Sequence, residues 1–180
     1  MIKTKEDLKC YIEADMAAAK KKGRIRWYEF ILKFVIHMRK AEYYKNCGRS
    51  IFAKVKFKYH FTFYYLLGCF LGFSIPLNSC DEGLYIPHRG TIVISTFSHI
   101  GKNCTINIGV NIGKNPYDEK KAPVLGDNIY IAPGAKIFGD IKIGNNIAIG
   151  ANAVVNKSFT QDNVVIAGVP AEIKSKKNWE

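Results

Sequence analysis

Four histidines are the side chains of this sequence best suited to proton transfer. The ordinary pKa of histidine is about 6.5, so an imidazole near neutral pH is partly uncharged and can act as a general base. His37 and His60 fall in segments with a helical pattern, where we expect structural roles. His99 precedes an inward-facing isoleucine, so strand alternation directs it outward, to the surface or a subunit contact. From its residue type alone, His88 is either a base or a polar residue at a turn.

The cysteines do not form a recognisable metal or redox motif. They are odd in number and include no CxxC pair, which argues against a zinc ribbon or a thioredoxin-type site. Free thiols in a reducing cytoplasm are the simplest interpretation. The amino terminus is charged and polar, unlike a signal peptide. The five are Cys10, Cys47, Cys69, Cys80 and Cys104.

Aliphatic residues in the second half of the chain recur every six positions. A second inward residue, often small or β-branched, stands two places before each of them, and glycines often follow. Residues two apart in a strand share a face, so both point inward, while glycine and asparagine allow the chain to turn at each corner. This period predicts coils that bend every six residues and stack on one another, rather than an antiparallel sandwich. The two runs are Ile94, Ile100, Ile106 and Ile112, then Leu125, Ile131, Ile137, Ile143, Ile149 and Val155.

The first 72 residues have a helical pattern instead. Thr4 and Asp7 resemble a capping box at the start of a first helix. A second helix is predicted over about 24–44 and a third over about 50–71. The apolar stripe of the second helix consists of Trp27, Ile31, Phe34, Val35 and Met38.

Positive charge is concentrated in the helical part. The net charge is +12, and residues 1–70 contain sixteen Lys and Arg against six Asp and Glu. Such a surface is either a solvated helical face or a contact for an anionic partner. No nucleic-acid motif is present, so we expect no nucleic acid. The apolar stretch 61–73 is shorter than the roughly 20 residues of a membrane span. With Lys20–Lys22, Arg24 and Arg26, it could instead hold the protein at an anionic membrane surface.

Three segments resemble the hexapeptide-repeat acyltransferases, most closely the serine O-acetyltransferase-like branch. They are GLYIPHRGTIVI (83–94), APGAKIFGDIKIGNNIAIGANAVV (132–155) and VIAGVPAEI (165–173). The resemblance implies a left-handed parallel β-helix of three hexads per coil, preceded by helices. We therefore expect a helical region over 1–72, a β-helix over 73–174 with a loop insert at 114–121, and a tail over 175–180.

The resemblance also implies direct acetyl transfer from acetyl-CoA to a hydroxyl, with His88 as the catalytic base. In this family acetyl-CoA lies between adjacent subunits of a trimer, which the helices could join into larger assemblies. The positions matching its contacts are Gly113, Gly134 and Ala151, with Gly113 also a candidate oxyanion donor. Lys157, Lys174 and Lys176 are candidates for the CoA phosphates. Two histidines in the repeat half are too few for the zinc site of related carbonic anhydrases, so no metal is expected.

Departures from the family pattern bear on the acceptor. Serine acetyltransferases carry an Asp before the catalytic His and a second His before a Pro, where this chain has Pro87 and Ala122. The site thus has few means to bind the ammonium of free serine. We therefore predict a saccharide acceptor, as in capsular or surface-polysaccharide O-acetyltransferases, with Tyr117 and Lys121 of the insert as contacts. Serine acetylation for cysteine synthesis is the alternative. Other acyl acceptors, or a non-catalytic binding or scaffold protein, are the remaining hypotheses.

Overall fold

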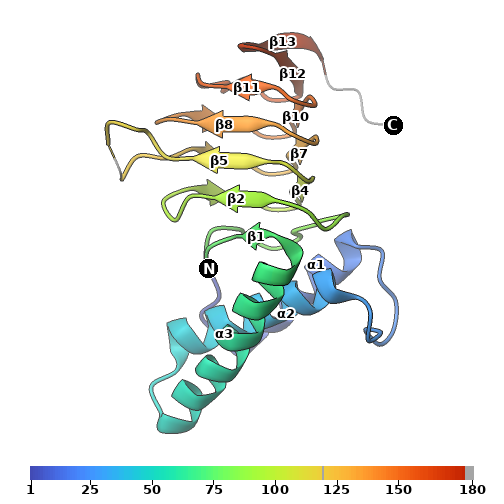
Figure 1. The fold of residues 1–180 in the computed structure, drawn as a ribbon, viewed down its shortest axis with the longest axis vertical. Coiled ribbons are helices and arrows are strands. Elements are labelled where there is room, and N and C mark those ends of the chain that lie inside the picture. Colours follow the sequence, from blue (N-terminus) through green and yellow to red (C-terminus); the bar gives the residue numbers. More distant parts are fainter. Residues whose placement is uncertain (119, 177–180) are drawn as a thin grey trace.

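The structure is a computed structural model that describes residues 1–118 and 120–176, and it places three helices at one end of a stack of short strands (Figure 1). The helices are α1 (Lys5–Ala18), α2 (Phe30–Cys47) and α3 (Ile51–Leu71). The strands of the lower stack are β1 (Phe73–Ser74), β2 (Ile92–Ile94), β3 (His99–Ile100), β4 (Thr105–Ile106), β5 (Asn111–Gly113) and β6 (Val124–Leu125). Those of the upper stack are β7 (Tyr130–Ile131), β8 (Lys136–Phe138), β9 (Lys142–Ile143), β10 (Ala148–Ile149), β11 (Val154–Val155), β12 (Val164–Gly168) and β13 (Ala171–Lys176).

The last strand extends beyond the predicted end of the β-helix at residue 174. β13 continues to Lys176, two residues into the segment expected as a tail. Residue 119 of the insert and residues 177–180 of the tail lie outside the described residues. Among the helices of the described chain, none combines the length and apolar character needed to cross a bilayer.

The first and third helices begin at side-chain caps. The Thr4 hydroxyl accepts a hydrogen bond from the Asp7 backbone N–H at 3.0 Å, and the Asp7 carboxylate accepts one from the Thr4 N–H at 2.9 Å. This confirms the predicted capping box, which satisfies backbone donors that the first turn would leave unpaired. The Ser50 hydroxyl caps α3 in the same way, accepting from the Ala53 N–H at 3.1 Å.

The predicted start of the second helix, near Arg24, is wrong. The α2 helix begins at Phe30, because the Glu29 carboxylate accepts the Arg26 backbone N–H at 2.5 Å and holds the preceding residues in a turn. Trp27 therefore lies outside the helix and is 77% exposed instead of joining its apolar stripe. Of the other predicted stripe residues, Phe34, Val35 and Met38 are buried and Ile31 is partly buried.

Successive short strands fall on three sheets in turn. In the described part of the chain the sheets are β1-β2-β5-β8-β11, β3-β6-β9 and β4-β7-β10-β12-β13, parallel except for the β12–β13 pair. Ile112 is aligned with Ile94 below it and Ile137 above it, so each coil places its strand directly on the previous one. Three sides built from six-residue steps are consistent with the predicted β-helix.

The predicted inward residues form the core of the stack. All ten aliphatic residues of the two runs are at most 4% exposed, which confirms the prediction from the six-residue period. Each such burial stabilises the fold by roughly 1.5–3 kcal/mol relative to leaving the side chain in water. The shared core of these stacked residues continues into Phe34 and Met38 of α2, so stack and helices are packed together.

Between the three sheets the chain turns at three columns of stacked corners, which we name by their most characteristic residues. The His88 corner contains residues 87–91, 107–110, 132–135 and 150–153. The insert corner contains residues 95–98, 114–118, 120–123, 139–141 and 156–158. The asparagine corner contains residues 101–104, 126–129, 144–147 and 160–163.

Asparagines in a left-handed conformation shape the third column. Asn103, Asn128, Asn146 and Asn163 have φ between 53° and 60°, a region that asparagine tolerates better than most residues. Side-chain oxygens link the layers: the Asp127 carboxylate accepts the Lys102 N–H at 2.7 Å, and the Asn145 amide oxygen accepts the Asp127 N–H at 2.9 Å. The Asp162 carboxylate continues the series by accepting the Asn145 N–H at 2.6 Å, so the coils from Lys102 upward are linked through the same type of contact.

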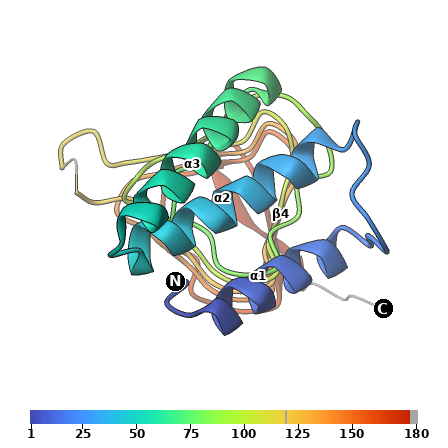
Figure 2. The ribbon, with the colours of Figure 1, turned by 90° about the horizontal axis from the view of Figure 1, so that it is seen from below.

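The helices lie across the lower end of the stack (Figure 2). Arg39 of α2 is fully buried at this junction, where it donates to the backbone oxygens of Cys80 and Asp81, both at 2.7 Å. The same guanidinium contacts the carboxylates of Asp15 and Glu42. One side chain therefore connects α1, α2 and the first coil.

Candidate functional site

His88 lies on the first coil, directly above the helical layer. The segment that leads to it is fixed from two sides: the Leu84 N–H donates to the Asp15 carboxylate at 2.8 Å, and the Tyr85 N–H donates to the Cys104 oxygen at 2.9 Å. The His88 side chain is exposed, and its ring has no hydrogen-bond partner among the described residues. An accessible imidazole on a rigid segment is suited to accept a proton from a bound molecule.

The His88 corner also contains two of the predicted acetyl-CoA contacts. Gly134 lies two coils above His88 and Ala151 three coils above it. With about 4.8 Å between neighbouring strands, this column extends roughly 14 Å from His88 to Ala151. Backbone bonds hold it together, from Gly109 N to Thr91 O (2.7 Å), Gly134 N to Ile108 O (2.9 Å) and Asn152 N to Pro133 O (2.9 Å).

Two positions of this corner carry small residues, Gly134 and Ala151. Gly134 has φ +78°, and a Cβ there would collide with the Asn152 side chain, so glycine fits both the conformation and the space. Ala151 is exposed on the coil above. An extended ligand could therefore approach the backbone along the column that ends at His88.

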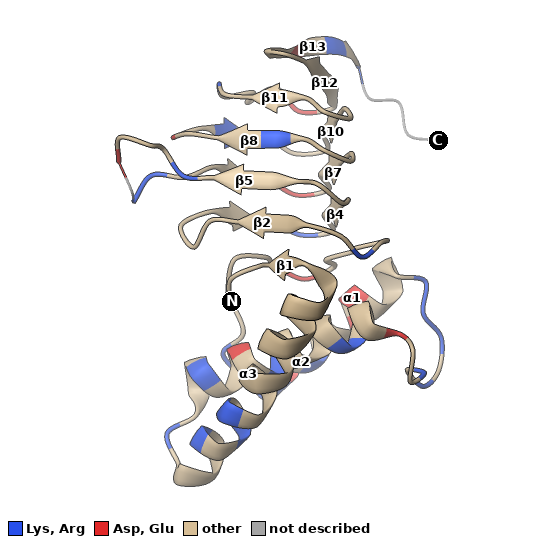
Figure 3. Ribbon diagram, viewed as in Figure 1, with Lys and Arg blue, Asp and Glu red and all other residues tan. Residues whose placement is uncertain are grey.

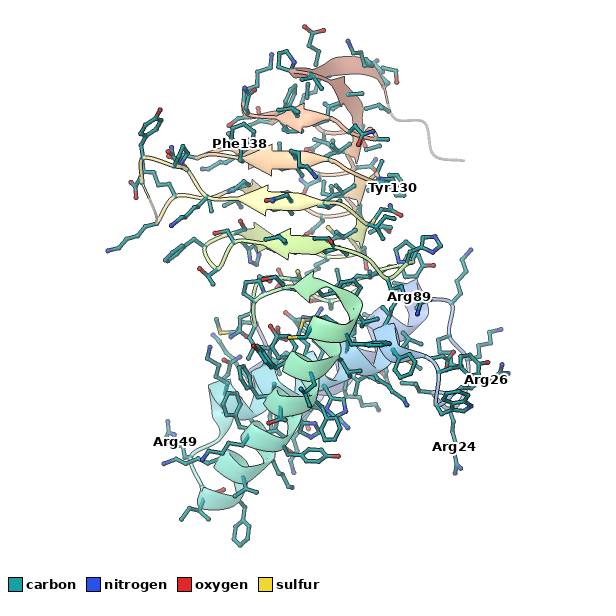
Figure 4. All side chains as sticks on the ribbon, in the orientation of Figure 1. Arg24, Arg26, Arg49, Arg89, Tyr130 and Phe138 are labelled. Atoms are coloured by element: carbon teal, nitrogen blue, oxygen red, sulfur yellow. The ribbon has the colours of Figure 1, made fainter. Side chains whose placement is uncertain are left out.

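The other predicted contacts lie at different places in the chain. Tyr117, Lys121 and Lys157 are on the insert corner, and Gly113 is the last residue of β5, directly before it. The insert projects from the end of β5 that is opposite to the His88 corner (Figure 1). Within one copy, Gly113 is thus separated from His88 by one side of the stack, and its predicted oxyanion role lacks support there. Figure 4 shows Arg89, the neighbour of His88, on the side away from the projecting insert.

The predicted phosphate-binding lysines and Lys121 of the insert contact other side chains of this chain, whereas Tyr117 of the insert is exposed. Lys174 on β13 pairs with Glu172 at 3.1 Å. The Lys157 ammonium lies 5.6 Å from the centre of the Phe159 ring. Lys121 pairs with Asp140 at 3.0 Å, and Tyr117 is 96% exposed.

A cavity of about 370 Å³ lies between the start of α2 and the first coil; Leu84, Pro87 and Arg89 line it, but His88 does not. Its rim carries Tyr28, Glu29 and Arg89, none of which was predicted as a site residue. The position of Arg89 next to His88 was the one signal in the sequence; the approach of Tyr28 and Glu29 depends on how the helices dock. The apolar wall is formed by Ile31, Leu32, Val35, Leu71, Leu84 and Ile86.

The remaining histidines lie elsewhere. His99 points outward as predicted, and its Nε2 is 3.1 Å from the Asp81 carboxylate. His37 and His60 face each other between α2 and α3, with their Nδ1 atoms 3.1 Å apart. Burial lowers the pKa of both, that of His60 to about 4. In the described chain, no three His, Cys, Asp or Glu side chains gather as a metal site would require.

Comparisons with known proteins identify relatives over most of the chain. A serine acetyltransferase of Staphylococcus epidermidis is 34% identical over 171 residues, covering 94% of this chain and 76% of that protein. One of Staphylococcus aureus strain Mu50 is 41% identical over 106 residues, 58% of this chain and 49% of that protein. No family model matches the chain.

Solved structures share the fold. A serine acetyltransferase of Brucella abortus superposes with a TM-score of 0.72 at 22% identity, covering 97% of this chain and 71% of that one. The soybean enzyme in complex with serine gives 0.71 at 21% identity, covering 94% and 70%. With the sequence relationship over nearly its whole length, the chain belongs to the serine acetyltransferase family of acetyl-CoA-dependent O-acetyltransferases.

Proposed function

We propose that this protein transfers the acetyl group of acetyl-CoA directly to an acceptor hydroxyl, with His88 as the general base. The observation that carries this proposal is the accessible imidazole, without a hydrogen-bond partner among the described residues, at the end of the column that includes Gly134 and Ala151. A thioester is already activated, so the enzyme needs no nucleophile of its own. The imidazole takes the hydroxyl proton as the oxygen attacks the carbonyl, and the thiolate of CoA leaves and is protonated.

The separation of the two corners supports a homotrimer. His88 and the insert lie on different columns of one copy, so neighbouring copies could complete a site by placing the insert corner of one against the His88 corner of the next. Lys157 and Tyr117 of one subunit would then approach acetyl-CoA bound along the His88 corner of its neighbour. We also propose, from the family resemblance, the left-handed sense of the coil, the boundaries 1–72 and 73–174, and larger assemblies through the helices.

Serine is the acceptor that the relatives support. The Staphylococcus epidermidis relative is named a serine acetyltransferase and aligns with 94% of this chain. This comparison favours serine over the saccharide predicted from the sequence, and it makes the synthesis of O-acetylserine the first candidate activity.

A saccharide acceptor in surface-polysaccharide synthesis is the second candidate. Pro87 and Ala122 stand where the family pattern has an acid and a histidine, and Ala122 is buried with 6% exposure, so neither offers a charged group to an amino acid.

The helical layer supports a location at the inner face of an anionic membrane. The α3 helix contains lysines but no Asp or Glu (Figure 3). Its lysines are exposed, as are several of its large apolar side chains. Apolar side chains beside cations are typical of helices that bind membrane interfaces. All five cysteines are free thiols, as in cytoplasmic proteins. The most exposed apolar residues of α3 are Ile51, Phe52, Val55, Tyr59, Tyr65, Leu66 and Phe70.

The base assignment is tested by His88→Ala and His88→Gln, assayed by thiol release with serine and a panel of sugars. We expect at least a hundredfold loss of kcat for both variants, within the usual range for a general base. Circular dichroism and thermal unfolding should match the unmodified protein because the side chain is exposed. Undiminished turnover by a folded His88→Ala variant would remove His88 from the mechanism.

A further inference from the structure

Residues 78–86 of the first coil pair with the coil above them and, within the described chain, rest on the helices instead of on a lower coil. Cys80 is aligned with Ile100 and Tyr85 with Thr105, both one coil higher. Successive residues of a strand direct their backbone groups to opposite neighbours, so every second residue of this segment faces the helices. Buried backbone groups of this kind need hydrogen-bond partners.

Buried charged side chains of α1 and α2 take the place of the missing lower coil. The Asp15 carboxylate accepts the Leu84 backbone N–H at 2.8 Å, and the Glu42 carboxylate accepts the Asn78 N–H at 2.7 Å. Arg39 lies between the two carboxylates, with nitrogens 2.8 Å from Asp15 and 3.1 Å from Glu42. All three charged side chains are at most 3% exposed, so water does not compete for these bonds.

His88 lies between two backbone anchors to the helical layer. The first is the bond of the Leu84 N–H to Asp15 of α1, four residues before the histidine. The second is Gly90, two residues after it, whose N–H donates to the oxygen of Leu71 at the end of α3 at 3.0 Å. The height of the histidine above the helices is therefore set from both sides, and on one side by a single buried carboxylate.

We propose that Asp15 is a positioning residue for acetyl transfer, because its bond to the Leu84 N–H holds the His88 imidazole in place beside the acceptor hydroxyl. This inference rests on the proposed general-base role of His88 and adds a residue of α1 to it. Asp15 is buried beneath the first coil and acts only through the backbone of residues 84–88. A displacement of a catalytic group by about 1 Å is enough to lower a rate roughly a hundredfold.

An amide-to-ester exchange at Leu84 tests the inference in the full-length protein. Incorporating the α-hydroxy analogue of leucine removes this N–H and leaves the ion pair of Asp15 with Arg39 in place. We expect kcat, measured by thiol release, to fall by roughly tenfold to a hundredfold, and KM for acetyl-CoA to change by less than about twofold. KM should persist because the column of Gly134 and Ala151 is bonded within its own coils.

The matched control is the same exchange at Val124, whose N–H donates to the Ile141 oxygen at 3.0 Å in the sheet β3-β6-β9. This ester also loses one backbone hydrogen bond, but it lies away from residues 84–90 and should keep the unmodified kcat. Equal kcat values for the two esters would overturn the inference.

Two substitutions of Asp15 provide a rescue test. Asp15→Asn and Asp15→Leu both lose the charge that pairs with Arg39, so Tm should fall in both. Only Asn retains an oxygen for the Leu84 N–H, so kcat should stay within about threefold in Asp15→Asn and fall in Asp15→Leu as it does in the Leu84 ester. A purely structural role predicts the same kcat per folded molecule in both variants, and that result would overturn the inference. If Asp15→Leu does not fold, the comparison of the two esters decides.

The NMR signal of the His88 ring, with carbon-13 at Cε1, gives a readout that does not need turnover. The ester at Leu84 should shift or broaden this signal, and the ester at Val124 should leave it unchanged. An identical His88 signal in both esters would contradict the positioning role. A turnover-competent His88→Ala variant would instead contradict the proposed base, while the NMR comparison still decides whether Asp15 fixes the segment.

Discussion

Arg39 and Asp15 face each other with two nitrogens opposite two oxygens, Nε to Oδ2 at 2.8 Å and Nη2 to Oδ1 at 3.3 Å. Both side chains are almost completely buried. The second oxygen of Asp15 also accepts the backbone N–H of Leu84, four residues before His88. The orientation of the proposed base therefore depends on an ion pair between two helices.

Removal of Arg39 should strongly destabilise the protein. Arg39→Met would leave the buried carboxylates of Asp15 and Glu42 without their cation, and we expect a loss of about 3–5 kcal/mol in the free energy of unfolding. Urea unfolding monitored by circular dichroism measures it. Arg49→Met, at an exposed position, should change stability by less than about 0.5 kcal/mol. Equal stability of the two variants would show that the buried network contributes little.

A bulky side chain at Ala151 should obstruct acetyl-CoA without unfolding the stack. Ala151 is exposed in the column above His88, so Ala151→Trp is expected to raise KM for acetyl-CoA by roughly tenfold or more, the loss of about 1.4 kcal/mol of binding. Thr160→Trp, exposed on the asparagine corner, is the control and should leave KM unchanged. If Ala151→Trp also leaves KM unchanged while Tm is unaltered, acetyl-CoA does not use this column.

Acidification should weaken the contact between α2 and α3. Burial, with the nearby charge of His37, lowers the pKa of His60 to about 4. The unfolded chain, with the ordinary pKa near 6.5, then binds a proton more readily than the folded one. Stability contributed by neutral His60 is therefore complete above pH 6.5 and is lost as the pH falls toward 4.

The measurement is Tm at several pH values between 7 and 4. The fall in Tm should be shallower in His60→Phe, which keeps a ring beside Tyr44, than in the unmodified protein. His88→Gln, which removes an exposed histidine, is the comparison. Parallel curves for His60→Phe and the unmodified protein would contradict the assignment.

Vesicle flotation tests the proposed membrane contact of α3. Binding to anionic vesicles should fall with salt, and each lysine near the surface should contribute about 1 kcal/mol. Phe52→Asp combined with Phe70→Asp should abolish flotation, since both side chains are more than 60% exposed on α3. Tyr117→Asp on the insert is the control. Failure of the unmodified protein to float with anionic vesicles at low salt would exclude this contact.

The sequence predicted the fold best in the repeat region, because its six-residue period sets which residues stack on one another. Six-residue spacing places Ile112 above Ile94 and, through the same register, brings Gly134 and Ala151 into the column of His88. Local chemistry also sufficed for the capping box at Thr4. Such features depend on neighbours a few residues away or on a regular repeat.

Contacts between distant segments could not be predicted in this way. The turn at Glu29 displaced the start of α2, because a side chain outside the helix competes for the backbone N–H of Arg26. The burial of Arg39 and the cavity lined by Tyr28 and Arg89 arise only when the helices dock on the first coil. A basic residue in a helical pattern gives no sign of whether it faces water or two carboxylates.

The repeated bonding of the asparagine corner leaves the length of the stack adjustable. Ile137 and Val155, eighteen residues apart, are paired in neighbouring coils, so a further coil of eighteen residues would find the same partners above and below. The helices fix His88 at the lower end, while the upper end could recede by about 4.8 Å per added coil. Duplication of one coil could therefore lengthen the stack without moving His88 or the helices that hold it.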